Sequence, residues 1–522
     1  MLIQSVLLAA FSLAGASYNE TLLLEPLPNS MLLSQFEFSL SQPIGNSLFP
    51  SYTLFPRSLG HIMHQTQTSE LHLRFSQGWW DQKSWGIEPR GGDTAGGIGV
   101  ELWAYVGGET QEIAIKNWYK LAHSLSGLFC ASLNFIDVQS SAQLTSDRPD
   151  AFLFKGALPG EPVCTENLTP YLKLLPCKWW SGIASILDGH TLFDSQWQTM
   201  ALDVSIDGSD YLLNQSISSV FNVQRLLSRL ESPLPQPLSK DKLNCMEGHP
   251  GCLPQNEPFC HWNLEKIFGR PILGRCPLTD SSIIQLNAPS WSLVVNGEQT
   301  QHKIELQDKS SLEISGDLTS LENPLSPPIS VDRSFSGSGQ QDGGIRVVFT
   351  NNRDVPVTLK YNEVLPWFMR VYLHTLKDPR NVVQSLEYQG SQIRGRPTQL
   401  DLEIKLEGNA QAYIEYSFDK SLLFIEEYPP DANHGFEIAP GVVYTSSGYT
   451  TRTTSLLLSL PVPDFSMPYN VIILTCTVIT LTTSSILNML VKVVVPESID
   501  EVFSSSPLKN GIAKIKQLIK RR

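Results

Sequence analysis

Apolar and polar residues alternate with a period of two along much of the chain. The alternation is clear in SELHLRFSQGWW (69–80), GVELWAYVGG (99–108) and TMALDVSIDGSDYLL (199–213). It returns in IRVVFTNN, VTLKYNEVLPWFMRVYLHTL and LDLEIKLEGNAQAYIEYSF, which lie between residues 345 and 418. This period is typical of half-buried antiparallel strands. The pattern therefore predicts a mainly β protein with some α, built from β-sandwich-like domains.

Two segments have helical periodicity instead. In residues 111–129 the apolar side chains Ile115, Trp118, Ala122, Leu125 and Phe129 fall on one helical face, which predicts a buried helix. The stretch VFNVQRLLSRLE, residues 220–231, predicts a second, shorter helix.

Two apolar segments near the ends of the chain predict targeting and anchoring. Leu7 to Leu13 lead into Ala14-Gly15-Ala16, which is the form of a signal peptide with its cleavage site, so residues 1–16 are predicted to be removed. Tyr469 to Val491 are 23 residues without a formal charge, long enough to cross a bilayer. This span is rich in Thr and Ser, and we expect its polar groups to favour neighbouring helices over lipid.

The charge after the predicted span sets its orientation. Residues 492–522 contain seven Lys and Arg residues against three acids, which predicts a cytosolic tail. About 30 residues follow the span, whereas a GPI-attachment signal would end within its hydrophobic segment. The chain is therefore predicted to be a single-pass type I membrane protein with its bulk outside the cytosol.

The pattern and composition divide the chain into predicted regions. These are a first β-rich domain at 17–221 with the buried helix, a helical and cysteine-rich insertion at 222–279, a second sandwich-like domain at 280–466, the transmembrane helix at 467–491 and the tail at 492–522. Residues 308–343 are polar and rich in Ser, Gly and Pro, which predicts a long mobile loop inside the second domain.

The overall charge and the motifs argue against several functions. A net charge of -13 argues against nucleic-acid binding, which needs a basic surface. The sequence has no H-E-x-x-H, P-loop or G-x-S-x-G motif, and GGIGVELW lacks the third glycine of a dinucleotide-binding loop. We therefore predict no catalytic residue, no metal site and no cofactor.

Eight cysteines carry the most specific chemistry. Cys476 lies inside the predicted span, which leaves seven in an oxidising compartment, so at least one is free or bonded to another chain. Four fall within 32 residues, at spacings unlike those of a zinc knuckle. They predict two local disulfides of unknown connectivity among Cys245, Cys252, Cys260 and Cys276.

Cys130, Cys164 and Cys177 supply one pair and one remaining thiol. Cys130 ends the predicted buried helix, and Cys177 follows the apolar YLKLLP, so both are expected to be internal. Cys164 lies between ALPGEPV and a glycosylation sequon, so it is expected to be exposed. Burial thus favours a Cys130–Cys177 disulfide with Cys164 facing outward, although the other pairings stay open. Candidate N-glycosylation sites are Asn19, Asn167 and Asn214.

Several strings resemble one known family. VCTENLTPYLKLLPC, SGLFCASLNFID, LPWFMRVYLHTL, PDANHGF and PDFSMPYNVIILTCTV are similar to the PIG-T subunit family of the GPI transamidase, in its fungal-type form. The similarity extends from about residue 20 to the span, in the same order and topology.

The resemblance implies a function. A PIG-T subunit is a non-catalytic scaffold in the endoplasmic reticulum membrane, within a complex that replaces a C-terminal signal of precursor proteins with a GPI lipid. The nucleophilic cysteine belongs to a caspase-like subunit, which the scaffold holds by an intermolecular disulfide. The cysteine of VCTEN, Cys164, is the implied bridging residue, and Asn433 and Asn470 match family asparagines assigned to GPI binding. Implied partners are this catalytic subunit, other membrane subunits, the GPI lipid and precursor proteins.

A receptor is the alternative from another class. Type I topology, a β-sandwich and the tryptophan pairs Trp79-Trp80 and Trp179-Trp180 would also suit a cell-surface glycan-binding protein. The Thr- and Ser-rich span argues against this reading, because a solitary receptor helix needs no helical neighbours.

Overall fold

The structure is a computed structural model. It describes residues 15–44, 52–178, 180–231, 259–300, 302–321, 324–337, 339–429, 432–462 and 466–492. Residues 1–461 form one compact unit and residues 462–522 a second. Each unit is described by itself.

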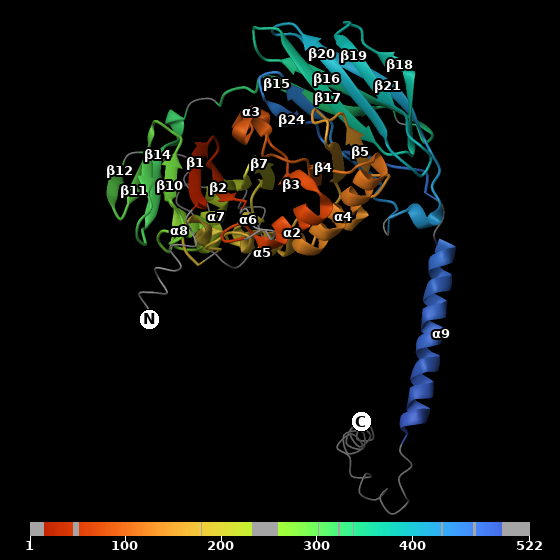
Figure 1. Ribbon diagram of the computed structural model, residues 1–522, viewed down its shortest axis with the longest axis horizontal. Helices are drawn as coiled ribbons and strands as arrows, with labels where there is room; N and C mark the ends of the chain where they lie inside the picture. The colour runs from red at the N-terminus through yellow and green to blue at the C-terminus, as the bar shows by residue number, and fades with distance from the viewer. Residues whose placement is uncertain are drawn as a thin grey trace, which may run out of the picture. The chain divides into compact units, whose positions relative to one another are not determined.

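A ten-stranded sheet is the centre of the first unit (Figure 1). Its spatial order is β13 (Lys303–Glu305), β10 (Ser281–Leu286), β1 (Ser17–Leu27), β2 (Met31–Pro43), β8 (Asp210–Asn222), β7 (Trp197–Asp207), β3 (Thr68–Gly78), β4 (Gly99–Val106), β6 (Phe152–Leu158) and β5 (Ser141–Leu144). Neighbouring strands are antiparallel except β1 and β10, which pair in parallel from Asn19 opposite Ser281 to Leu24 opposite Leu286. Strand β1 begins at Ser17, the first residue after the predicted signal peptide; residues 1–14 of that peptide lie outside the described residues.

The alternation along the strands assigns the two faces of this sheet. In β3, Leu71, Leu73 and Phe75 belong to the main core and pack toward the helices. The helices on this face are α2 (Arg57–Thr66), α4 (Gln111–Phe129), α5 (Thr165–Lys173), α6 (Gly189–Leu192), α7 (Val223–Glu231) and α8 (Leu264–Phe268) (Figure 1). The two helices predicted from periodicity are confirmed as α4 and α7. The remaining short helix, α3 (Gln82–Trp85), carries Trp85 against Trp80.

A β-sandwich forms the second half of the first unit. One sheet has the order β15 (Ile329–Ser336), β16 (Asp342–Asn351), β21 (Gln411–Lys420) and β18 (Met369–Lys377). The other has the order β19 (Val383–Gln389), β20 (Thr398–Leu406), β17 (Val357–Leu365), β23 (Val442–Thr445) and β24 (Thr450–Arg452). Both sheets supply residues to one hydrophobic core, where Phe349 of β16 packs edge-on against Tyr361 of β17. A two-stranded sheet, β22 (Phe436–Ile438) with β25 (Leu456–Leu458), adds to this core. The mainly β fold class is confirmed.

Two predicted boundaries are wrong. Residues 281–317 do not begin the sandwich, because β10 and β13 complete the ten-stranded sheet. The rest of this segment joins a separate sheet of β12 (Glu298–Thr300), β11 (Trp291–Val295), β14 (Leu312–Asp317) and β9 (Phe259–Asn263). The predicted loop at 308–343 also contains strands β14 and β15. Their polar composition resembles that of a loop, but part of it is buried by tertiary packing, since Ser315 of β14 is 2% exposed and Arg333 of β15 is 4% exposed.

Buried polar contacts join the sandwich to the ten-stranded sheet. Arg452 of β24 donates from Nε to Oε2 of Glu101 in β4 at 2.9 Å, with both side chains almost fully buried. The Thr451 hydroxyl donates to Glu88 at 3.0 Å. Burial opposes ionisation of Glu101, but the charges of Arg452 and Lys155 and the hydrogen bonds to the carboxylate together outweigh it and lower the pKa of that carboxyl. These contacts explain why the two predicted domains make one compact unit.

The second unit contains α9 (Ser466–Val491). Its residues Tyr469–Val491 are long and apolar enough to span a membrane, as the sequence predicts. Four threonine hydroxyls of the helix donate to carbonyls one turn back, for example Thr475 to Val471 and Thr480 to Cys476, both at 2.7 Å. Because these hydroxyls are satisfied within the helix, the Thr content does not by itself demand neighbouring helices. The tail from residue 493 lies outside the described residues.

Candidate functional site

Cys164 lies at the start of α5, on the helical face of the ten-stranded sheet. It is the N-cap residue, its backbone is extended, and its side chain is exposed. Its backbone N–H donates to Oδ1 of Asn167 at 2.9 Å. Asn167 occupies the third helical position, from which a polar side chain can reach back to the N-cap amide. The sequence thus folds locally so that the thiol is presented at a fixed helix end.

The same asparagine joins Cys164 to the end of α4. Its Nδ2 donates to the carbonyls of Phe129 and Cys130, both at 3.1 Å, and the side chain is 2% exposed. A glycan on this buried nitrogen would replace one of its two hydrogens and so break one of these hydrogen bonds, which disfavours the prediction of Asn167 as a glycosylation site. The sequence signal for this cap is an asparagine three residues after the N-cap cysteine, in Cys-Thr-Glu-Asn. The same asparagine begins the Asn-Leu-Thr sequon, so it was interpreted as a glycosylation site. Asn19 is half-buried and accepts from the Ser281 hydroxyl, whereas Asn214 is exposed on β8.

The predicted Cys130–Cys177 disulfide is wrong. Cys130 is exposed because it caps α4 in the left-handed conformation, with φ of 52°, so it leaves the buried face that the helical period predicted. Cys177 is buried, as expected, and is bonded to Cys276 across 99 residues. The prediction of two local disulfides among the four later cysteines is therefore also wrong, since Cys276 leaves that set. Cys245 and Cys252 lie outside the described residues, and Cys260 is half-buried in β9.

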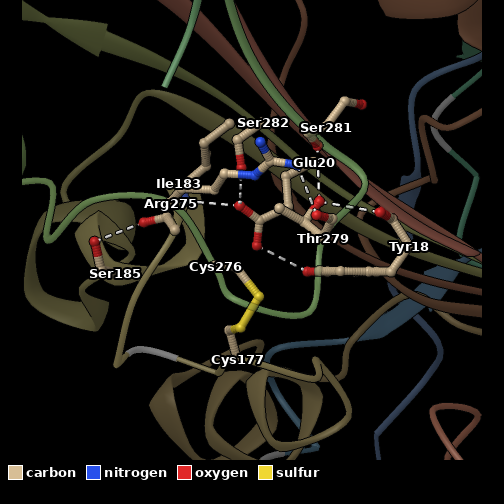
Figure 2. The surroundings of a disulfide bond; sticks show 11 residues. Tyr18, Glu20, Cys177, Ile183, Ser185, Arg275, Cys276, Thr279, Ser281 and Ser282 are labelled. Carbon is tan, nitrogen blue, oxygen red and sulfur yellow. Dashed lines mark hydrogen bonds between the residues drawn. A yellow bond between two sulfur atoms is a disulfide. The ribbon is translucent and has the colours of Figure 1, made fainter. Parts of the chain in front are cut away.

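The Cys177–Cys276 disulfide lies beside a buried carboxylate (Figure 2). Glu20 of β1 accepts hydrogen bonds from the Tyr18 hydroxyl at 3.0 Å, the Ile183 backbone at 3.0 Å and the Ser282 hydroxyl at 2.9 Å. Burial raises the pKa of Glu20 more than these hydrogen bonds lower it. The disulfide and this carboxylate together fasten the segment after α5 to strands β1 and β10. Cys177 is therefore structural, and Cys164 is the accessible thiol of the VCTENLTPYLKLLPC segment.

The two predicted GPI-binding asparagines lie far apart in the chain. Asn433 is exposed in the turn at residues 432–434, at the C-terminal end of the first unit. Asn470 is exposed in the first turns of α9, in the second unit. The structure describes each within its own unit.

Comparison with known proteins identifies the family. The family model described as "Gpi16 subunit, GPI transamidase component" matches residues 2–520. The chain is 38% identical to the GPI transamidase component GPI16 of Saccharomyces cerevisiae, over 96% of this chain and 92% of that protein. It is 33% identical to the PIG-T homolog of Schizosaccharomyces pombe, over 94% and 93%. It is 29% identical to the human GPI-anchor transamidase component PIGT, over 91% and 90%. The chain therefore belongs to the Gpi16/PIG-T family of GPI transamidase components.

Proposed function

We propose that this chain is the non-catalytic scaffold of a GPI transamidase in the endoplasmic reticulum membrane. It holds the caspase-like subunit that carries the catalytic cysteine, and the complex replaces the C-terminal signal of precursor proteins with a GPI lipid. The bulk of the chain lies in the lumen, and α9 anchors it. The observation that supports this proposal is that the chain belongs to the Gpi16/PIG-T family. The same observation disfavours the alternative of a cell-surface receptor.

The covalent contact of the scaffold is assigned to Cys164. Its side chain is exposed, it is outside the Cys177–Cys276 disulfide, and the hydrogen bonds of Asn167 fix the helix end that presents it. A rigidly presented thiol loses little conformational freedom when it bonds to a partner. The disulfide then raises the effective concentration of two chains that already share an interface, so it strengthens the complex and does not create it.

Cys164→Ser is expected to remove a reducible, higher-mass band from a non-reducing gel of the detergent-solubilised complex. The band in the unsubstituted protein should contain the caspase-like subunit. Cys130→Ser is the matched control, because Cys130 is also exposed and its carbonyl bonds the same asparagine. A band that survives in Cys164→Ser, or that is lost only in Cys130→Ser, would contradict the assignment.

The GPI lipid is assigned to Asn433 and Asn470. A side-chain amide can donate to phosphate and accept from hydroxyls, as the headgroup of such a lipid requires. Both asparagines are exposed. Asn470 is the second residue of the apolar segment Tyr469–Val491, at the depth where a lipid headgroup meets a membrane helix.

Asn470→Ala is expected to raise the GPI concentration needed for half-maximal transamidation about tenfold, the cost of one hydrogen bond to a charged group. The assay follows anchored product in reconstituted membranes. Asn488→Ala is the matched control, because Asn488 is exposed on the same helix about 27 Å away along its axis. Equal effects of both substitutions would show that the helix and not the Asn470 amide is responsible, and would count against the assignment.

A further inference from the structure

A cavity of about 620 Å³ lies between the ten-stranded sheet and the sandwich. Strands β3, β4, β5 and β6 line one side, and β17, β19, β20, β23 and β24 line the other. Its size falls in the range of small-molecule binding sites. It is separate from Cys164, which does not line it.

Lys155 of β6 lines this cavity, and the charges of the Glu101 and Asp401 carboxylates act on its ammonium. The side chain is 8% exposed, and its one hydrogen bond among the described residues is a long one, 3.5 Å from Nζ to Oδ1 of Asn362. Burial lowers the pKa of Lys155 to about 8. An ammonium has three donors, and one hydrogen bond of Lys155 is found among the described residues, so its other donors have room for further acceptors. A ligand that enters the cavity can supply those acceptors.

Charged groups of both signs surround Lys155. Two amides, those of Asn362 and Gln399, donate to the Asp401 carboxylate, and Arg452 is engaged by Glu101. Three exposed residues, Asp93, Lys360 and Glu387, line the cavity without a side-chain hydrogen bond to another described residue. A phosphate-rich ligand would meet these carboxylates, and a polycation would meet Lys155 and Arg452. A hydroxyl group both donates and accepts hydrogen bonds. A neutral ligand rich in hydroxyls can therefore bond to both the cationic donors and the carboxylate acceptors of the cavity wall.

Aromatic residues supply the apolar part of the wall. Trp103 stacks on His72 at 5.2 Å between ring centroids, and the Arg74 guanidinium lies 4.9 Å from its centroid, so its position is fixed. Tyr444 also lines the cavity and is 41% exposed. An exposed ring beside convergent polar groups can receive the C–H face of a sugar while its hydroxyls bond to the polar groups.

We propose that this cavity binds a neutral oligosaccharide, with Lys155 donating to ligand oxygens and the rim carboxylates accepting from ligand hydroxyls. The glycan of a glycolipid and that of a glycoprotein share this chemistry. The inference does not use the bridge at Cys164 or the amide of Asn470, so it stands or falls separately from them.

The test measures binding of fluorescently labelled mannotriose, maltotriose and chitotriose to the purified, detergent-solubilised complex. Saturable binding of at least one trisaccharide is expected, and Lys155→Met should weaken it about tenfold to a hundredfold. Glu387→Gln, at the exposed rim, should weaken it less and is not expected to disturb folding. Lys309→Met is the matched control, because Lys309 is exposed and does not line the cavity. Unlabelled deacylated glycolipid headgroup and released N-glycans then compete for the site, and the stronger competitor identifies the source.

Three results would overturn the proposal. They are no saturable binding of any of the three trisaccharides, equal affinity in Lys155→Met and Glu387→Gln, and displacement of the trisaccharide by inorganic phosphate at constant ionic strength. The non-reducing gel of Lys155→Met should still show the bridged band. Loss of sugar binding in that variant is therefore distinguishable from loss of the complex.

Discussion

Arg333→Met is expected to lower the free energy of unfolding by about 3–5 kcal/mol, because it leaves a buried carboxylate without its cation. Arg333 donates from Nη1 to Oε1 of Glu363 at 2.7 Å, and neither side chain has any exposed area. Its Nη2 donates to the carbonyls of Ala439 at 2.8 Å and Thr454 at 2.9 Å. The substitution thus breaks contacts among four segments of the sandwich at once.

Urea unfolding of the full chain in detergent, followed by tryptophan fluorescence, measures this effect. Lys377→Met is the matched control, because the Lys377–Glu415 pair spans 3.4 Å with Lys377 65% exposed, and such pairs contribute at most about 1 kcal/mol. Glu363→Gln in the Arg333→Met background should recover part of the loss, since it removes the uncompensated charge. If Arg333→Met cost no more than Lys377→Met, the buried pair would not stabilise the sandwich.

Cys177→Ser is expected to destabilise the first unit by about 2–5 kcal/mol. The Cys177–Cys276 disulfide closes a loop of 99 residues, and longer loops lose more conformational entropy when they are closed. Cys276→Ser should have the same effect, and the double substitution should cost no more than either alone, because all three remove one bond.

Thermal unfolding of the full chain in detergent measures this prediction. Cys130→Ser is the control, because this thiol is exposed and outside the Cys177–Cys276 disulfide, and it should change stability by less than about 0.5 kcal/mol. Costs that add in the double substitution would mean that each cysteine acts through its packing and not through the disulfide.

Local periodicity explains which elements could be predicted from the sequence. The helix at 111–129 has the same bounds in the structure, because its capping residue Thr110 and its apolar face are both local signals. The strands around residues 71, 102 and 202 are likewise visible from alternation. Arguments from burial alone left open which of the three cysteines is unpaired. The resemblance to the family singled out Cys164, which is exposed in the structure.

Long-range pairing was hidden from the same reasoning. Nothing within residues 281–286 indicates that they pair with residues 19–24, or that Cys276 meets Cys177. Cys130 was misplaced because one left-handed residue ends the helical period. The polar cavity around Lys155 was missed because its lining comes from nine strands that only the fold brings together.

The parallel pairing of β1 with β10 has a consequence for biosynthesis. Partners such as Asn19 and Ser281 are 262 residues apart, which takes roughly 13–52 seconds to translate at about 5–20 residues per second. During that interval the outer edge of β1 has no partner, and Cys177 is present without Cys276 while Cys130 and Cys164 are already available. An unpaired strand edge can pair with another chain and cause aggregation. Thiols that are present before their native partner can form incorrect disulfides. We therefore expect that correct folding of this subunit requires protection of the β1 edge and of these thiols until β10 has been synthesised.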